Sequence, residues 1–249
     1  MFNERKFFSV NLDIKDLKHL KVELTRFMMA YQFAVDELST KINILKDEFT
    51  YIHDYNPIEH VKSRVKSPES ILQKVQRKGV LLSLPSIKEN IKDIAGIRIT
   101  CSFISDIYVI AEMLQKQKDI TLVEYKDYIK NPKPNGYQSL HLILEIPIFM
   151  TDREESVYVE LQIRTIAMDF WASLEHKIYY KYNKAIPERL IEELKEAATV
   201  ANMLDRKMEE LHNEVNTIKQ EDSEEDLLLL GEGNVSLPMQ VIQSLIGNK

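Results

Sequence analysis

The chain has 249 residues, of which 44% are hydrophobic and 29% are charged, and its formal net charge at pH 7 is -6. This composition is sufficient for the core of one or two domains, contains no apolar run near the ~20 residues that cross a membrane, and argues against general nucleic-acid binding. The single cysteine, Cys101, excludes an internal disulfide and a cysteine-based zinc site. The first 16 residues lack the apolar core of a signal peptide, and we expect a cytoplasmic protein.

Helical spacing dominates the first third of the chain. Between residues 17 and 49, apolar residues recur three and four positions apart without an intervening Gly or Pro. This spacing predicts one long amphipathic helix. Residues 67–69, Ser-Pro-Glu, predict the start of a second helix, because Ser caps a helix, Pro fits its first turn and an acid favours its positive end. Gly79 predicts the end of that helix.

The middle of the chain combines strand and helix patterns. Alternating and β-branched runs predict four strands, at residues 97–103, 120–125, 139–146 and 157–164. Asp106 is expected to cap a helix that follows the first of these strands, and Thr165 to cap a helix that follows the last. A second long helix is predicted after Pro187, where apolar residues again recur three and four positions apart.

Together these elements predict an α/β (α+β) fold, with a mixed β-sheet core bracketed by long N- and C-terminal helices. The expected parts are an N-terminal helical segment (1–54), a core (55–184), a C-terminal helix (185–219) and an acidic, then apolar tail (220–249) of unassigned structure. The apolar stripes of the end helices can pack on the core or on another copy of the chain. Because large apolar patches seek partners, we expect a homo-oligomer.

Polar side chains share one face of the predicted sheet. Glu160, Gln162 and Arg164 lie on the same face of their strand, because side chains two positions apart point the same way. Ser139 and His141 take the polar face of another strand. Arg98 does so in the first strand, which follows Asp93 directly. These faces could line one cleft, or they could form the solvent-exposed side of an antiparallel sheet.

Two further stretches favour an anionic ligand that carries a ring. Six basic residues occur between His60 and Lys78, opposed only by Glu69: Lys62, Arg64, Lys66, Lys74, Arg77 and Lys78. On an acidic protein such a cluster points to a small anion, although a solvated helix face would have the same composition. Residues 131–141, "NPKPNGYQSLH", form a stiff loop with Lys133 between two prolines and with Tyr137, Gln138 and His141 at its exit. A cation, a flat ring and hydrogen-bonding side chains suit a nucleotide.

Phosphoryl transfer needs cations for the phosphates, carboxylates for Mg²⁺ and a group that activates the nucleophile. Asp93 and Glu160 could supply the carboxylates, Tyr137 could stack on a base, and six cations could bind phosphates: Arg64, Lys66, Lys74, Arg77, Lys78 and Arg98. Each also has an ordinary structural explanation, such as a loop acid for Asp93 or a core histidine for His141. The sequence has neither a P-loop nor a Rossmann glycine motif, so side chains would replace the glycine-rich backbone of those folds.

Four motifs, in this order, resemble the synthetase domain of RelA/SpoT-type enzymes: "HVKSRVKSPESI", "DIAGIRI", "YKDYIKNPKPNGYQSLH" and "VELQIRTIAMDFWASLEH". The resemblance covers residues 53–183 and is closest to the short, stand-alone small alarmone synthetases of the RelP-like type. It implies a nucleotidyltransferase-like core, often assembled as a tetramer. The implied reaction, part of the stringent response, transfers pyrophosphate from ATP to the 3′-hydroxyl of GTP or GDP. Its products are pppGpp or ppGpp and AMP, and it requires Mg²⁺.

The same resemblance implies roles for individual residues. Arg64 and Arg98 correspond to arginines that sandwich adenine, and Lys66, Ser70, Lys74 and Lys78 to the set that binds the ATP phosphates. Asp93 and Glu160 correspond to the Mg²⁺ ligands, and Glu160 also to the group that activates the 3′-hydroxyl. Tyr137 corresponds to the ring that stacks on guanine, with Lys133, Gln138, His141, Gln162 and Arg164 as its neighbours. Asp169 stands where some relatives carry an Asn that contacts guanine.

The chain departs from the long family members in two places. Residues 124–127, Glu-Tyr-Lys-Asp, stand where long members often have Arg-x-Lys-Asp, which bears on the choice of metal and acceptor. His53-Asp54 is an isolated pair, and the chain lacks room for the family's hydrolase domain, so we expect synthesis only. A nucleotide-sensing module without turnover and a helical scaffold protein are the alternatives; the presence of both Asp93 and Glu160 favours the enzyme.

Overall fold

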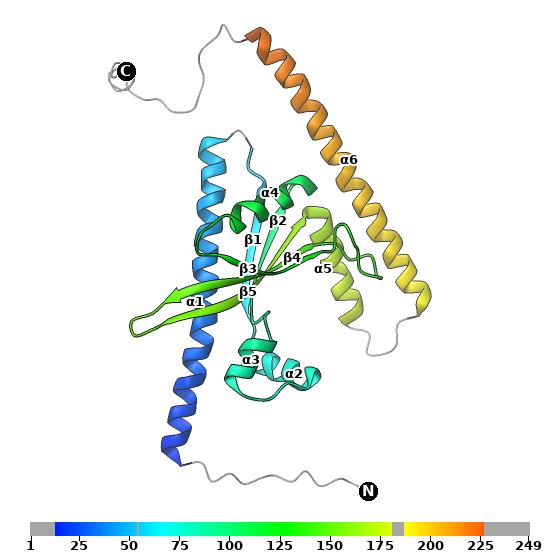
Figure 1. Cartoon of the computed structure of the whole chain (residues 1–249). Helices are drawn as coiled ribbons and strands as arrows, with labels where there is room; N and C mark the ends of the chain where they lie inside the picture. The colour runs from blue at the N-terminus through cyan, green and yellow to red at the C-terminus, as the bar shows by residue number, and fades with distance from the viewer. Residues whose placement is uncertain (1–12, 54, 181–186, 227–249) are drawn as a thin grey trace, which may run out of the picture. The chain divides into compact units, whose positions relative to one another are not determined.

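The computed structural model describes residues 13–53, 55–180 and 187–226, and its centre is one five-stranded mixed sheet (Figure 1). The strands are β1 (Ile58–Val65), β2 (Ala95–Cys101), β3 (Thr121–Asp127), β4 (Leu140–Phe149) and β5 (Glu154–Thr165), in the order β1-β2-β5-β4-β3. β2 and β5 are parallel, whereas the other neighbouring pairs are antiparallel. The predicted mixed sheet is therefore confirmed.

Six helices accompany this sheet in the described part of the chain: α1 (Ile14–Ile52), α2 (Pro68–Lys78), α3 (Leu84–Asn90), α4 (Ile104–Gln115), α5 (Ile166–Tyr180) and α6 (Glu188–Asp226). The chain divides into two compact units, residues 1–207 and 208–249, so that α6 begins in the first unit and continues into the second. The predicted long helices at both ends are confirmed. None of the described helices is long and apolar enough to span a membrane.

The sheet has one apolar face and one polar face. In β2 and β5, Ile97, Ile99 and Leu161 alternate with polar residues and are buried in the main core. Helix α1 packs against the sheet and adds Leu38 and Ile42 to the same core. Because α1 covers the apolar side, the alternating polar side chains of these strands are left to form a site on the other side.

The predicted apolar stripe of the first helix is buried only in its middle. Tyr31, Leu38 and Ile42 are at most 2% exposed, whereas Leu17 and Leu20 are 49% and 55% exposed. The apolar stripe of α1 is therefore exposed at its N-terminal end.

Two of the three predicted N-terminal helix caps are confirmed. The Ser67 hydroxyl accepts the backbone N–H of Ser70 at 3.3 Å, and Gly79 ends α2 at a φ of 65°. Thr165 caps α5, as predicted, by accepting the N–H of Met168 at 3.1 Å. Asp106 does not occupy the cap position of α4, because this helix begins two residues earlier; its carboxylate instead accepts the N–H of Phe103 at 3.0 Å.

Three further features differ from expectation. Strand β1 and helix α3 were not predicted, and two of the six residues of the basic cluster, Lys62 and Arg64, lie on β1 rather than on a helix face. Ser139 does not share the polar face with His141: it precedes β4, is fully buried, and donates to the carbonyl oxygen of Ile163 at 3.2 Å. Helix α6 continues beyond Lys219 to Asp226, while the rest of the predicted tail, and Asp54, lie outside the described residues.

Candidate active site

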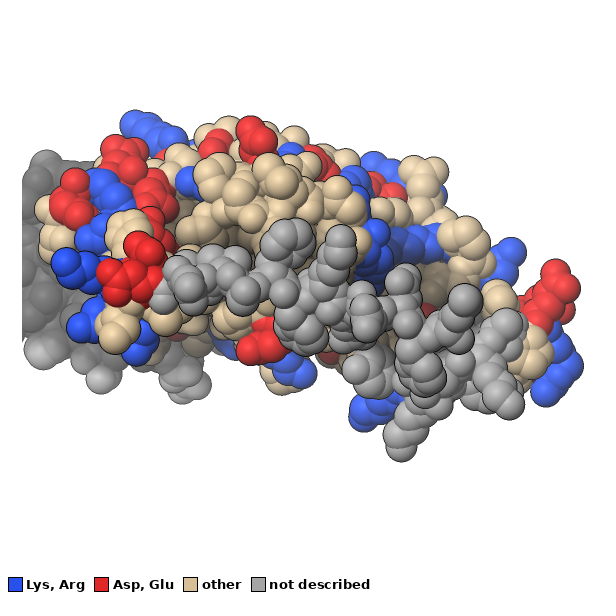
Figure 2. Space-filling view, turned by 90° about the horizontal axis from the view of Figure 1, so that it is seen from below, with Lys and Arg blue, Asp and Glu red and all other residues tan. Residues whose placement is uncertain are grey.

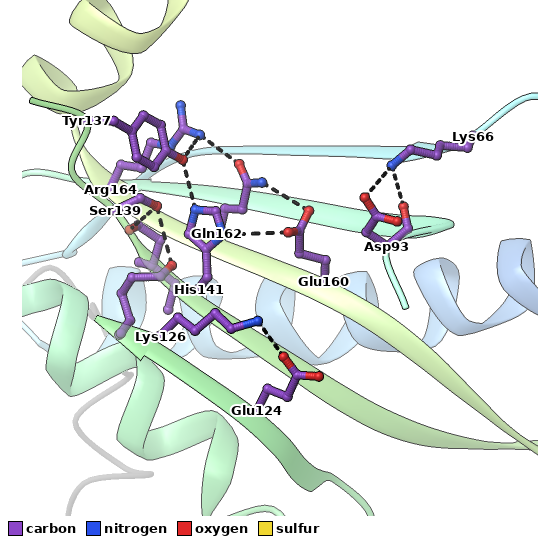
Figure 3. Close-up of polar contacts among 12 residues, drawn as sticks. Lys66, Asp93, Glu124, Lys126, Tyr137, Ser139, His141, Glu160, Gln162 and Arg164 are labelled. Atoms are coloured by element: carbon purple, nitrogen blue, oxygen red, sulfur yellow. Dashed lines mark hydrogen bonds and ion pairs between the residues drawn. The ribbon is translucent and has the colours of Figure 1, made fainter. Parts of the chain in front are cut away.

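A row of polar side chains on β5 forms the centre of the site, as the strand periodicity predicts. Gln162 donates to Glu160 Oε2 at 3.0 Å, and Arg164 donates to Gln162 Oε1 at 2.7 Å (Figure 3). Each side chain in the row therefore fixes the orientation of the next. The Glu160 carboxylate is held at one end of the row and the buried Arg164 guanidinium at the other.

The neighbouring strand β4 adds His141, which lies opposite Gln162 in the sheet register. Its Nε2 is 2.8 Å from the Tyr137 hydroxyl, and its Nδ1 is 3.5 Å from Glu160 Oε1. Arg164 donates to the same hydroxyl at 2.7 Å. These contacts are all satisfied when the Tyr137 proton points to His141 Nε2, which places the imidazole proton on Nδ1, facing Glu160.

The surroundings of Glu160 favour its ionised form. Burial raises the pKa of this carboxyl, but the hydrogen bond and charge of His141, assisted by Gln162, outweigh burial and lower the pKa below its ordinary value. The charge of Asp93 acts in the opposite direction, so the two carboxylates are close enough to influence one another. At neutral pH Glu160 is thus a carboxylate that can accept a proton or bind a cation.

Asp93 lies two residues before β2, between two lysines. Lys66 donates to its Oδ2 at 2.9 Å and to its backbone carbonyl oxygen at 2.6 Å (Figure 3). Lys74 of α2 donates to the same Oδ2. Burial raises the pKa of Asp93, but these lysines more than compensate and lower it. Its Oδ1 is buried and has no hydrogen-bond partner among the described residues.

The two carboxylates fit a divalent cation that also contacts a nucleotide. No group of three or more His, Cys, Asp or Glu side chains able to hold a metal occurs in the described part of the chain. A Mg²⁺ ion in a phosphate-transfer site usually takes only one or two carboxylates and completes its shell with substrate phosphates and water. The free Oδ1 of Asp93 and the ionised Glu160 match that requirement.

A small cavity of about 190 Å³ opens beside Glu160, between β1, β2 and β5. Its lining includes Lys62, Arg64, Arg98 and Gln162, so cations surround much of it. Arg64 lies opposite Gly96 in the β1–β2 register. On the face in Figure 2, Lys and Arg side chains gather in one hollow, while elsewhere basic and acidic side chains are interspersed. This distribution suits a compact anionic ligand better than a long polyanion.

The other predicted phosphate-binding residues lie along α2. Ser70 belongs to the cap of this helix, where Ser67 Oγ lies 3.1 Å from its hydroxyl oxygen. Lys78 donates to the carbonyl oxygen of Asn90 at 3.0 Å, and Arg77 is exposed in the last turn. Lys66 and Lys74 are thus brought together at Asp93, whereas no described contact joins Arg77 or Lys78 to that group.

The predicted acceptor-side residues surround Tyr137. Lys133 Nζ is 4.7 Å from the centroid of the Tyr137 ring, and the Arg164 guanidinium is 5.2 Å from it. Gln138 donates to the carbonyl oxygen of Ile129 at 3.4 Å. Asp169 of α5 accepts from Arg98 at 3.1 Å and from Arg164 at 3.2 Å, so it connects the cavity side of the site to the tyrosine side.

Lys62 and Glu124 were noted in the sequence but were not among the predicted site residues. Lys62 lines the cavity; the alternation of Lys62, Arg64 and Lys66 was the signal that could have revealed a strand there. Glu124 accepts from Lys126 at 2.6 Å and from Lys92 at 2.9 Å. These two lysines lower the Glu124 pKa to about 2, which makes this position a further ion-paired carboxylate beside the polar face (Figure 3).

Comparisons with known proteins identify the relatives of this chain and of its fold. The family described as "Region found in RelA / SpoT proteins" matches residues 63–185. GTP pyrophosphokinase YwaC of Bacillus subtilis is 55% identical over 200 residues, which cover 80% of this chain and 95% of that protein. The crystal structure of small alarmone synthetase 2 from Bacillus subtilis has a TM-score of 0.70 at 54% identity, covering 77% of this chain and 99% of the other. Small alarmone synthetase 1 from the same organism, bound to its product pppGpp, has a TM-score of 0.71 at 42% identity, covering 78% and 98%.

Proposed function

Because the chain belongs to the RelA/SpoT family of alarmone synthetases, we propose that it is a GTP pyrophosphokinase. It transfers the β,γ-diphosphate of ATP to the 3′-hydroxyl of GTP or GDP and releases AMP. One observation carries this proposal beyond the family likeness: the hydrogen-bonded row Glu160–Gln162–Arg164 connects an arginine-lined cavity to the loop that carries Tyr137. Donor and acceptor nucleotides can therefore meet at Glu160 on one face of the sheet.

On the donor side, Arg64 and Arg98 bind adenine in the cavity that they line, because planar guanidinium groups stack well on flat rings. Lys66 and Lys74 bind the ATP phosphates, with Ser70, Arg77 and Lys78 completing the set along α2. In the structure both lysines are held by Asp93. They are thus already ordered for the phosphates, and the ordering cost of binding is reduced.

On the acceptor side, Tyr137 stacks on guanine, and Lys133 moves from its place near that ring when the base binds. Arg164 and His141 hold the tyrosine hydroxyl, so the ring keeps its orientation. Gln138, Gln162 and Asp169 supply hydrogen-bonding groups around the base and ribose. Aromatic stacking provides affinity for the base, while the polar groups provide the preference for guanine.

In the reaction, the 3′-oxygen of the acceptor forms a bond to the β-phosphorus of ATP, and the bond from that phosphorus to the bridging oxygen of AMP breaks. Glu160 accepts the hydroxyl proton. Because the pKa of Glu160 is low, this carboxylate takes the proton only when bond formation has made the hydroxyl acidic. Asp93 and Glu160 would hold Mg²⁺, which neutralises phosphate charge in such reactions. His141 keeps Glu160 oriented.

We extend the proposal to assembly, domain limits and location. Exposed apolar side chains on α1 (Leu17, Leu20) and on the first half of α6 (Val200, Met203) support a homo-oligomer, which we propose to be a tetramer. The synthetase core is taken as residues 55–184, bracketed by residues 1–54 and 185–219 and followed by the tail 220–249. The enzyme synthesises without hydrolysing and works in the cytoplasm, where its nucleotide substrates are found.

The test is product identification. The protein is incubated with ATP, GTP and Mg²⁺, and nucleotides are separated by chromatography, with ATP alone as control. The proposal predicts AMP and a guanosine nucleotide with a 3′-diphosphate in equal amounts, and neither product without GTP. ADP with free phosphate would indicate an ATPase, and nucleotide binding without any product would indicate a sensor; either result contradicts the proposal.

A further inference from the structure

The first half of α6 lies directly against the loop that carries Tyr137. Gly136 in this loop has a φ of 89°, and a Cβ atom built on it would lie 2.6 Å from the Cβ of Ala198 and 3.3 Å from the Cα of Lys195. Real Cβ contacts are essentially never that short. The loop backbone therefore touches the surface of α6, and only glycine permits both the conformation and the approach.

A side-chain hydrogen bond joins the same two segments. Asn202 of α6 donates to Gln138 Oε1 at 2.9 Å, while Gln138 donates to the carbonyl oxygen of Ile129 at the beginning of the loop. The Asn202 side-chain oxygen accepts from Arg206 at 3.1 Å. Gln138 is thus held from both sides, and its neighbour in sequence is Tyr137, the proposed guanine-stacking residue.

Helix α6 also holds the start of α5, the helix that carries Asp169. Asp205 accepts the hydroxyl proton of Thr165 at 2.5 Å, and Thr165 caps α5 through Met168. Trp171 of α5 donates its indole N–H to the carbonyl oxygen of Leu194 at 3.0 Å. These contacts hold α6 in place beneath the acceptor side of the site.

We propose that the face of α6 formed by Leu194, Ala198, Asn202 and Asp205 is a positioning element for the acceptor nucleotide, and that Asn202 acts through Gln138. The inference rests on the proposed function, because it requires that residues 131–141 bind the acceptor. A loop that is held by α6 before binding loses little conformational entropy when guanine binds. The described contacts of the Asn202 side chain are with Gln138 and Arg206 and not with Lys66, Lys74 or Asp93, so its effect falls on the acceptor and not on ATP.

The experiment uses the full chain and compares Asn202→Ala with Thr199→Ala. Thr199 is a matched control: it is exposed on the same helix, and among the described residues its hydroxyl bonds only to the carbonyl oxygen of Lys195. Loss of one hydrogen bond predicts a KM for GTP about 2- to 10-fold higher in Asn202→Ala, with the KM for ATP unchanged. Because Ala is a better helix former than Asn, the melting temperature is expected to stay the same or rise, which a merely destabilising substitution would not produce.

A double-variant test separates this inference from its alternatives. In a Gln138→Ala background, Asn202→Ala should cause no further change in the KM for GTP, because the partner through which it acts is gone. Additive effects, equal changes in both KM values, or a response equal to that of Thr199→Ala would overturn the inference. If the parent protein makes no 3′-diphosphate product, the proposed function itself fails, and this result is seen before any variant is compared.

Discussion

Replacement of Tyr137 by alanine should weaken the use of the acceptor nucleotide far more than the use of ATP. Stacking of a base on an aromatic ring is worth roughly 1–3 kcal/mol, which corresponds to a rise of about 5- to 150-fold in the KM for GTP or GDP. The substitution also removes the hydroxyl that accepts from Arg164 and contacts His141. We therefore expect some loss of kcat, since His141 in turn orients Glu160.

Tyr137→Phe separates the ring from the hydroxyl. It keeps the stacking surface, and Arg164 keeps its bonds to Gln162 and Asp169, so the KM for GTP should change less than tenfold. Tyr51→Ala, at a residue 82% exposed near the end of α1, controls for loss of any tyrosine. Initial rates are measured with GTP and ATP varied separately. An equal rise in both KM values for Tyr137→Ala, or a larger effect for Tyr137→Phe, would refute the stacking argument.

The remaining predictions concern the metal and assembly. Asp93→Asn should lower turnover by roughly 10²-fold or more at limiting Mg²⁺. Because the loss is one of metal affinity, a higher Mg²⁺ concentration should restore part of the turnover. A loss of turnover that is the same at all Mg²⁺ concentrations contradicts this role. Light scattering at micromolar concentration should give the mass of a tetramer. The double variant Leu20→Glu, Met203→Glu should have a lower mass, because it places charges on the exposed apolar stripes. A monomeric mass for the parent protein contradicts the assembly proposal.

Local signals in the sequence were sufficient for the centre of the site. Strand periodicity placed Glu160, Gln162 and Arg164 on one face because β5 lies in the middle of the sheet, where alternation between an apolar core and a polar face is strict. The caps at Ser67 and Thr165 were readable for a similar reason, since each depends on a bond to the backbone three residues away.

Strand β1 was missed because its apolar residues do not alternate. Its apolar residues fall at Ile58, Val61 and Val65, and its register with β2 shifts between Ile58 and His60. Such an irregularity moves apolar residues out of the two-residue period on which a strand prediction depends. As a result local spacing showed Lys62 and Arg64 only as part of a charge cluster, and the role of Arg64 beside Arg98 rested on the family resemblance.

Contacts between segments far apart in the sequence could not be predicted, because the local spacing of residues does not report them. Lys74 and Asp93 are 19 residues apart, and the bond from Asn202 to Gln138 spans 64 residues. The role of α6 at the acceptor loop therefore had no signal in the spacing of its residues, which indicated only an amphipathic helix. The hydrogen-bonded ion pair between Arg98 and Asp169, which are 71 residues apart, likewise had no signal in local spacing.

The central claim, that the diphosphate is transferred on the polar face at Glu160, is tested most directly by the turnover of Glu160→Gln. The amide has nearly the same shape and leaves the apolar face of β5 unchanged, so melting and nucleotide binding should resemble those of the parent. It accepts a proton poorly and is a weak metal ligand, and loss of general-base assistance alone lowers kcat by about 10²–10⁴-fold. A variant that melts and binds nucleotides like the parent and forms AMP at less than about a hundredth of the parental rate is the predicted result; one that keeps more than about a tenth of the parental kcat would show that Glu160 is not the activating group.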